Sequence, residues 1–171
     1  SDVIVTALHA AAARLADPQR AIDTVFVDAA RRLDDLWGSD ECDFLAVTLA
    51  AGTLSRALHR FETESGVGHE AVAPVDAPTL LLAPAPGETH TLGMQLAASH
   101  LTRGGWHVLL DAGLSLPELL TVVRRIKPDV VGLSVASLEV VRTLPHVVAA
   151  LRRMGPGAPR AIFLGGQAVD C

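Results

Sequence analysis

Three residues in the middle of the chain have the types and spacing of a metal-ligand site, Glu88-x-His90-x-x-Gly93. Neutral imidazole is a common metal ligand, and a carboxylate that accepts a hydrogen bond from the second ring nitrogen fixes the tautomer and raises the basicity of the first. Glu88 is two residues from His90 and can play this part. A glycine at position 93 leaves room for the backbone to approach a bulky ligand. The pattern predicts that His90 binds a metal and that Glu88 orients it.

Small residues occur at two later points, Ser134 with Ser137 and the pair Gly165-Gly166. The serines offer hydrogen-bond donors and leave space where an extended ligand could enter. Ser137 also precedes an apolar-periodic stretch, so a helix cap is an equal alternative for it. The glycine pair allows a ligand to contact the backbone, with a tight turn as the alternative.

The sequence contains no pattern that would assign a catalytic reaction. We find no nucleophile next to a base, no pair of carboxylates and no G-x-x-x-x-G-K phosphate loop. We therefore predict a binding protein and not an enzyme.

The residues above follow short apolar segments that alternate with helical patterns. We predict strands at 79–83, 106–110, 129–134 and 161–164, and helices at 91–102, 116–126 and 138–154. This alternation is typical of right-handed crossovers in a parallel, doubly wound α/β sheet. Ligands bind beyond the carboxyl ends of such strands, where the loops carry His90, the serines and the glycine pair.

The first part of the chain has only helical periodicity. Apolar residues recur every three or four positions over 2–16, from Pro18 to Gly38, and from Phe44 to about Ser65. Asp17 and Pro18 are a natural cap and first helical residue. We predict a helical cap over 1–66, a linker over 67–77 and an α/β domain over 78–171, with the usual last helix and strand of such a domain missing.

Composition limits the partners. The formal net charge is -5, and the arginine pairs Arg31-Arg32, Arg124-Arg125 and Arg152-Arg153 are far apart in the sequence. We interpret the pairs as solvated helix faces and predict no direct binding to nucleic acid, which would need cations on one face. Two cysteines without C-x-x-C spacing and the lack of a long apolar run predict a soluble cytoplasmic protein without a membrane partner.

The second part of the chain resembles the cobalamin-binding domain family, whose signature is D-x-H-x-x-G, then S-x-L, then G-G. The matching residues are Glu88, His90 and Gly93, then Ser134 or the Ser137-Leu138 pair, then Gly165 and Gly166. The resemblance implies that His90 displaces the corrin's own lower base and ligates cobalt, with Glu88 as its orienter. It also implies that the serines and the glycine pair line the channel for the nucleotide tail. Glu in place of Asp, and Ala136 where S-x-L has Leu, depart from the signature.

The first part resembles the helical caps of such proteins, which carry W-x-x-G-x-x-S-V-A-x-E-H. Trp37 matches the aromatic, whereas Val47-Thr48 replace the Glu-His pair that faces the upper side of the corrin. This variant resembles the antirepressor group of purple photosynthetic bacteria, which includes the AerR and PpaA proteins and the carboxyl-terminal SCHIC domain of AppA.

That resemblance implies a regulatory tetrapyrrole sensor, held between cap and sheet, that controls photosynthesis genes through contact with a PpsR/CrtJ-like repressor. It leaves cobalamin and haem open as the cofactor. His59 lies close to three helical turns beyond Thr48 and is an alternative haem ligand, with a surface histidine as the other interpretation. The alternatives to a sensor are a corrinoid carrier of a methyltransferase system and a ligand-free docking module.

Overall fold

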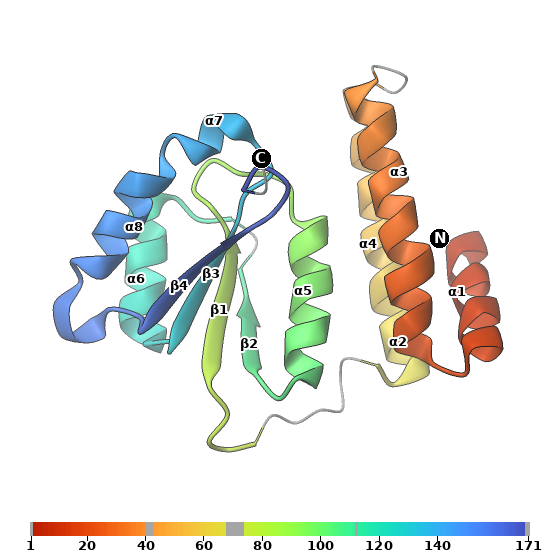
Figure 1. The fold of residues 1–171 in the computed structure, drawn as a ribbon, viewed down its shortest axis with the longest axis horizontal. Coiled ribbons are helices and arrows are strands. Elements are labelled where there is room, and N and C mark those ends of the chain that lie inside the picture. The colour runs from red at the N-terminus through yellow and green to blue at the C-terminus, as the bar shows by residue number, and fades with distance from the viewer. Residues whose placement is uncertain (1, 40–42, 68–73, 112, 170–171) are drawn as a thin grey trace. The chain divides into compact units, whose positions relative to one another are not determined.

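The structure is a computed structural model that describes residues 2–39, 43–67, 74–111 and 113–169. The chain divides into two compact units, Ser1–Glu70 and Ala71–Cys171. Figure 1 shows the first as helices only and the second as a sheet with helices on both faces. Most of the predicted linker, residues 68–73, lies outside the described residues.

The helical unit follows the predicted periodicity closely. Its helices are α1 (Asp2–Leu15), α2 (Pro18–Ala21), the π-helical segment η1 (Ile22–Phe26), α3 (Val27–Gly38) and α4 (Phe44–Ser65). Asp17 caps α2 by accepting hydrogen bonds from the amides of Gln19 and Arg20. Gly66 ends α4 in the left-handed conformation that favours glycine. The π turn was not predicted, because Ile22 and Phe26 keep an apolar spacing that an unbroken α-helix would also have.

The α/β unit is a parallel sheet of four described strands in the order β2-β1-β3-β4. The strands are β1 (Thr79–Pro84), β2 (His107–Leu110), β3 (Val130–Ser134) and β4 (Ala161–Gly165). The helices are α5 (Leu92–Arg103), α6 (Leu116–Ile126), α7 (Leu138–Val141) and α8 (Leu144–Arg152), with the 3-10 segment η2 (Gly155–Gly157) before β4. The predicted doubly wound α/β class is confirmed.

Strand β1 shows how one apolar run serves two faces. Its side chains alternate, so that Leu81 and Ala83 join the core under α6 and α8 while Leu80 and Leu82 join a second cluster with Met94 of α5. A strand covered on both faces needs apolar residues at every position, which is why this segment is a continuous run and not an alternating one.

One predicted element is wrong. The sequence predicts a single helix over 138–154, whereas the structure has α7 and α8 with a break at Arg142 and Thr143. Pro145 causes the break, because it has no amide hydrogen to donate and its ring would clash with the carbonyl four residues earlier. It lies instead in the first turn of α8, where amide donors have no helical partner.

Candidate functional site

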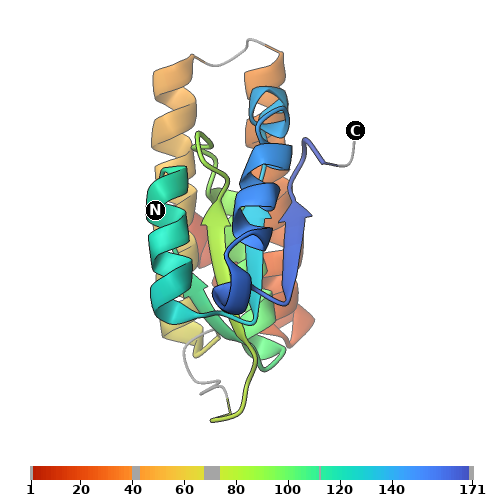
Figure 2. The same ribbon diagram turned by 90° about the vertical axis from the view of Figure 1, so that its left-hand side faces the viewer.

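Three strands of the sheet end side by side. Pro84 of β1 pairs with Ser134 of β3, which pairs in turn with Gly165 of β4. The loops that follow these strands therefore leave the sheet at one edge, and Figure 2 shows this edge above the arrowheads. The structure thus places the regions around His90, the two serines and the glycine pair together, as the sequence predicts.

Glu88 and His90 form the contact that their spacing suggests. The Oε1 atom of Glu88 lies 2.5 Å from Nδ1 of His90 and also accepts the amides of Thr89 at 2.8 Å and His90 at 3.0 Å. A carboxylate can only accept, so Nδ1 carries the hydrogen in the neutral ring and the lone pair lies on Nε2. The loop backbone and the imidazole are therefore held by the same oxygen atom.

The second oxygen of Glu88 reaches the loop after β3. Its Oε2 atom accepts the amides of Ala136 and Ser137, each at 2.9 Å. Burial of the carboxyl raises its pKa, but the hydrogen bonds from His90, Ala136 and Ser137 outweigh burial, so the pKa of Glu88 falls from 4.5 to about 2. The ionised carboxylate of Glu88 therefore connects the loops after β1 and β3 by hydrogen bonds. This connection was not predicted.

The imidazole of His90 points into open space although its orienter is buried. The side chain of His90 is 62% exposed, against 1% for Glu88. Its Nε2 atom has no hydrogen-bond partner among the described residues. A fixed ring with a free, exposed nitrogen is the arrangement that a metal ligand needs.

The glycines of the signature differ in what surrounds them. A Cβ atom added at Gly93 or Gly165 would meet no described atom within 4 Å, so the space beside both is open. Gly166 has a φ of +119°, and an added Cβ would lie 2.4 Å from the carbonyl oxygen of Val135. The tight-turn alternative therefore describes Gly166, and close approach of a ligand stays a prediction for the other two.

The serines divide in a similar way. The hydroxyl of Ser137 accepts the amide of Glu139 at 3.2 Å and caps α7, so the cap alternative is present in the structure. The backbone carbonyl of Ser134 accepts the amide of Ala85 at 2.9 Å, which ties the ends of β3 and β1 together. Lining of a nucleotide channel stays a prediction for both residues.

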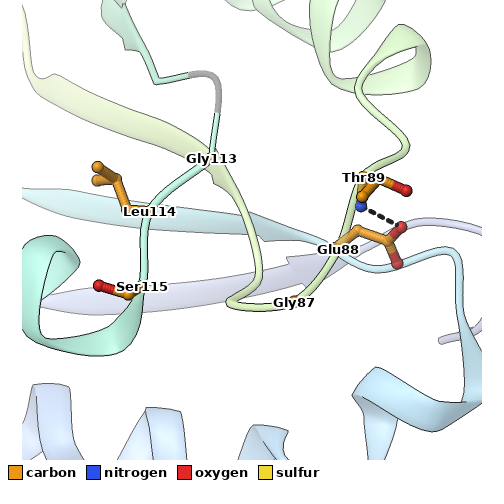
Figure 3. Close-up of a pocket in the computed structure, with 6 residues that line it drawn as sticks. All are labelled: Gly87, Glu88, Thr89, Gly113, Leu114 and Ser115. Carbon is orange, nitrogen blue, oxygen red and sulfur yellow. Dashed lines mark hydrogen bonds between the residues drawn. The ribbon is translucent and has the colours of Figure 1, made fainter.

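An open depression of about 500 Å³ adjoins Glu88. Figure 3 shows its lining, Gly87, Glu88 and Thr89 from the loop after β1 and Gly113, Leu114 and Ser115 from the loop after β2. The loop after β2 was not predicted to belong to the site. A readable signal was the capping box Ser115-x-x-Glu118, which places the start of α6 at this edge.

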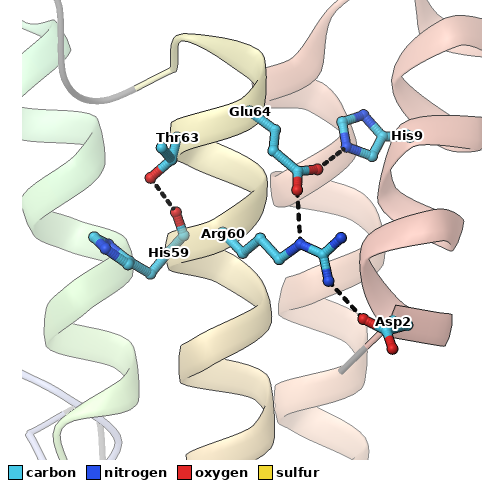
Figure 4. A network of polar contacts seen from close by, with 6 residues as sticks. All are labelled: Asp2, His9, His59, Arg60, Thr63 and Glu64. Carbon is cyan, nitrogen blue, oxygen red and sulfur yellow. Dashed lines mark hydrogen bonds and ion pairs between the residues drawn. The ribbon is translucent and has the colours of Figure 1, made fainter.

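Two predicted residues lie in the other unit. Trp37 belongs to α3, and its side chain lies outside the described part of the structure. His59 is exposed on α4, where Figure 4 shows it near Arg60 and Thr63. Across the described residues no group of three or more His, Cys, Asp or Glu side chains could hold a metal ion. His90 can thus supply one ligand, as an axial ligand does to a metal held by a macrocycle.

None of the helices in the described ranges is both long and apolar enough to cross a bilayer.

Comparisons with known proteins agree with this geometry. Residues 78–171 match the family model of the B12 binding domain. A 20.5 kDa protein of the bchF-crtJ intergenic region of Rhodobacter capsulatus is 31% identical over 143 residues, which cover 84% of this chain and 73% of that protein.

A solved structure shows the same fold at lower identity. A cobalamin-binding protein from Desulfitobacterium hafniense is 17% identical, with a TM-score of 0.50 over 97% of this chain and 75% of the other. The methanol:cobalamin methyltransferase complex MtaBC from Methanosarcina barkeri is 16% identical, with a TM-score of 0.47 over 87% of this chain and 62% of the other. Since the family model matches more than half of the sequence and includes the loops described above, this chain belongs to the B12-binding domain family.

Proposed function

We propose that this chain is a regulatory module that binds cobalamin at the carboxyl edge of its sheet, with Nε2 of His90 as the axial ligand to cobalt. The observation that carries the proposal is the fixed orientation and the exposure of the His90 imidazole. Glu88 holds Nδ1, and Nε2 is exposed without a described partner.

The residues at this edge fit the cofactor. Open space beside Gly93 and Gly165 leaves room for a flat macrocycle and its tail, and the depression beside Glu88 adds to it. When bound, cobalamin supplies a cobalt ion with an axial position that accepts an imidazole nitrogen. Glu88 stays ionised near neutral pH because of its low pKa, so it keeps the hydrogen on Nδ1 and the lone pair on Nε2. A single exposed imidazole of this kind also fits haem, which the experiment below includes.

Two observations outside the site support a regulatory role for this chain in preference to a role in methyl transfer. Val47 and Thr48 on α4 stand where the helical caps of related proteins carry Glu-His, so no base or ligand is available at these positions. The relative from Rhodobacter capsulatus is encoded beside crtJ. We infer that the partner is a CrtJ-like transcriptional repressor and that the chain acts as its antirepressor.

A spectral titration tests the cofactor. Purified apoprotein is titrated with hydroxocobalamin and, separately, with hemin, and the visible spectrum is followed. We expect a spectral shift with hydroxocobalamin that is lost in His90→Ala and kept in the control His107→Ala, because His107 begins β2 at the opposite edge of the sheet. No shift with wild type, or an equal shift in His90→Ala, contradicts the proposed ligand. A shift with hemin alone gives the site to haem.

A mobility-shift assay tests the regulatory part. A CrtJ-like repressor on its operator DNA is mixed with the chain, with and without cobalamin. We expect release of the DNA that depends on the cofactor and is lost in His90→Ala. Release by the cofactor-free chain and by His90→Ala to the same extent would favour a ligand-free docking module. Cobalamin binding without any effect on the repressor would favour a corrinoid carrier.

A further inference from the structure

Six cationic side chains gather at the amino-terminal edge of the sheet, opposite the candidate cofactor site. All are exposed, and we call them the basic edge: Arg124, Arg125, Lys127, Arg152, Arg153 and Arg160. Together they are six of the fourteen Lys and Arg residues in the chain.

The topology of the fold brings them together. In a parallel sheet with right-handed crossovers, each helix runs back against the strands and ends where the next strand begins. Helices α6 and α8 contact each other, and Figures 1 and 2 show them side by side, ending beside the starts of β3 and β4. The arginine pairs are far apart in the sequence, but they lie at the ends of two helices that contact each other. All four side chains are exposed, which agrees with their interpretation as solvated helix faces, and the topology adds that both helix ends lie at one edge of the sheet.

Few carboxylates balance this charge. Arg160 pairs with Asp129 at 3.6 Å, and the other five have no ion pair among the described side chains. Cations in the last turn of a helix complement its dipole, but that dipole amounts to only about half a charge per helix end. The basic edge therefore keeps a net positive charge that the fold itself does not use.

Lys127 stands at a helix end where glycine is the usual residue. It ends α6 with a φ of 52°, in the left-handed region. A lysine accepts this conformation at a cost, and residues held in such conformations often have a function. Here the consequence is one more exposed cation at the basic edge.

The other charges of the α/β unit indicate which kind of anionic partner fits the basic edge. Within the unit that carries the basic edge, residues 71–171, the charges other than the basic edge and Asp129 are two arginines and six Asp or Glu residues. A long polyanion such as duplex DNA extends past the basic edge and meets this negative remainder, whereas a short acidic segment does not. Five of the six cations are arginines, whose planar guanidinium binds carboxylates with two parallel hydrogen bonds.

We propose that the basic edge docks an acidic segment of a partner protein. The site lies on the opposite edge from His90 and is separate from the cofactor, so its test needs no cobalamin. In this proposal the arginines at the ends of α6 and α8 and at the start of β4 bind closely spaced Asp and Glu side chains of the partner segment.

Anisotropy with three labelled probes tests the proposal on the full chain. The probes are a short peptide of alternating Glu and Ser, duplex DNA of equal charge, and phosphatidylserine vesicles. We expect the peptide to bind best and binding to weaken with salt. The variant Arg124→Glu/Arg152→Glu should weaken peptide binding about tenfold or more, because rim charges set steering and complementarity.

The matched control is Arg31→Glu/Arg32→Glu, which makes the same change in net charge on exposed positions of α3 and should leave peptide binding unchanged. Arg124→Gln/Arg152→Gln, with folding checked by circular dichroism, separates lost binding from lost structure and should weaken binding to a smaller extent. Equal losses in the variant and the control overturn the proposal. So does the absence of peptide binding, or stronger binding of DNA or vesicles through the same arginines.

Discussion

Glu88 is the residue on which the candidate site depends. Its two oxygens accept four backbone amides and one ring N-H, from the loops after β1 and β3. Such a carboxylate is stabilised in its charged form, and removing one partner leaves buried groups unsatisfied at about 1–3 kcal/mol each. The conformation of both loops and the orientation of the His90 ring therefore depend on the same carboxylate.

This network predicts an acid-dependent stability. The pKa of Glu88 is about 2 in the folded chain and near 4.5 when unfolded, so its contribution is fully present above pH 4.5 and is lost as pH falls toward 2. The size of the contribution is on the order of 3 kcal/mol. Urea unfolding between pH 6 and pH 3 measures the larger part of this contribution, as the part of the pH dependence that disappears in Glu88→Gln. Glu139→Gln, an exposed carboxyl in the same region, is the control. An unchanged pH dependence in Glu88→Gln contradicts this role.

At the scale of elements, the helix starts and strand ends determine what can approach His90. Gly93 lies in the first turn of α5 with open space beside it, whereas Gly166 is packed against the backbone of Val135. Glycine at position 93 thus leaves space beside the helix, whereas glycine at position 166 is needed for the backbone conformation of the turn. A larger side chain can therefore replace Gly93, but not Gly166, without disturbing the fold.

Gly93→Ala separates these roles. Alanine has the higher helix propensity and meets no described atom, so we expect stability to be unchanged or raised by up to about 1 kcal/mol. If the corrin lies against α5, the added methyl group should nevertheless weaken cobalamin binding. Denaturant unfolding and the hydroxocobalamin titration on the same sample measure both. Unchanged affinity would mean that the corrin does not approach this turn.

Much of the element pattern can be predicted from sequence, because it rests on local signals. Continuous apolar runs such as 79–83 mark buried strands, and Asp17-Pro18 marks a helix start. The pairing of Glu88 with His90 follows from their spacing. The reach of Glu88 to Ala136 and Ser137 could not be predicted, because it joins loops nearly fifty residues apart. The basic edge could not be predicted for the same reason, since only the crossovers bring the ends of α6 and α8 to one edge of the sheet.

At the scale of the whole molecule, the chain is two units with different charge and architecture. The α/β unit carries its proposed cofactor site at one edge of the sheet and the basic edge at the other. The helical unit contains Trp37, His59 and the Val47-Thr48 pair. Coverage of the ligand by the helical unit stays a prediction.

Cofactor binding should raise the stability of the whole chain. A ligand that binds only the folded state at about 100 times its Kd adds about 2.7 kcal/mol, which corresponds to a rise in Tm of roughly 5–10 °C for a chain of this size. Scanning calorimetry with and without hydroxocobalamin measures it. The rise should be absent in His90→Ala and present in His107→Ala. A rise that survives in His90→Ala would mean that binding does not need the imidazole.

The most direct test of axial ligation by His90 is electron paramagnetic resonance of the chain loaded with cob(II)alamin. The unpaired electron couples to the axial nitrogen, so the splitting identifies where that nitrogen comes from. In protein labelled uniformly with nitrogen-15 we predict that each cobalt line splits into a doublet, because the nitrogen belongs to His90. A triplet unchanged by the label would show that the corrin keeps its own base, and would contradict axial ligation by His90.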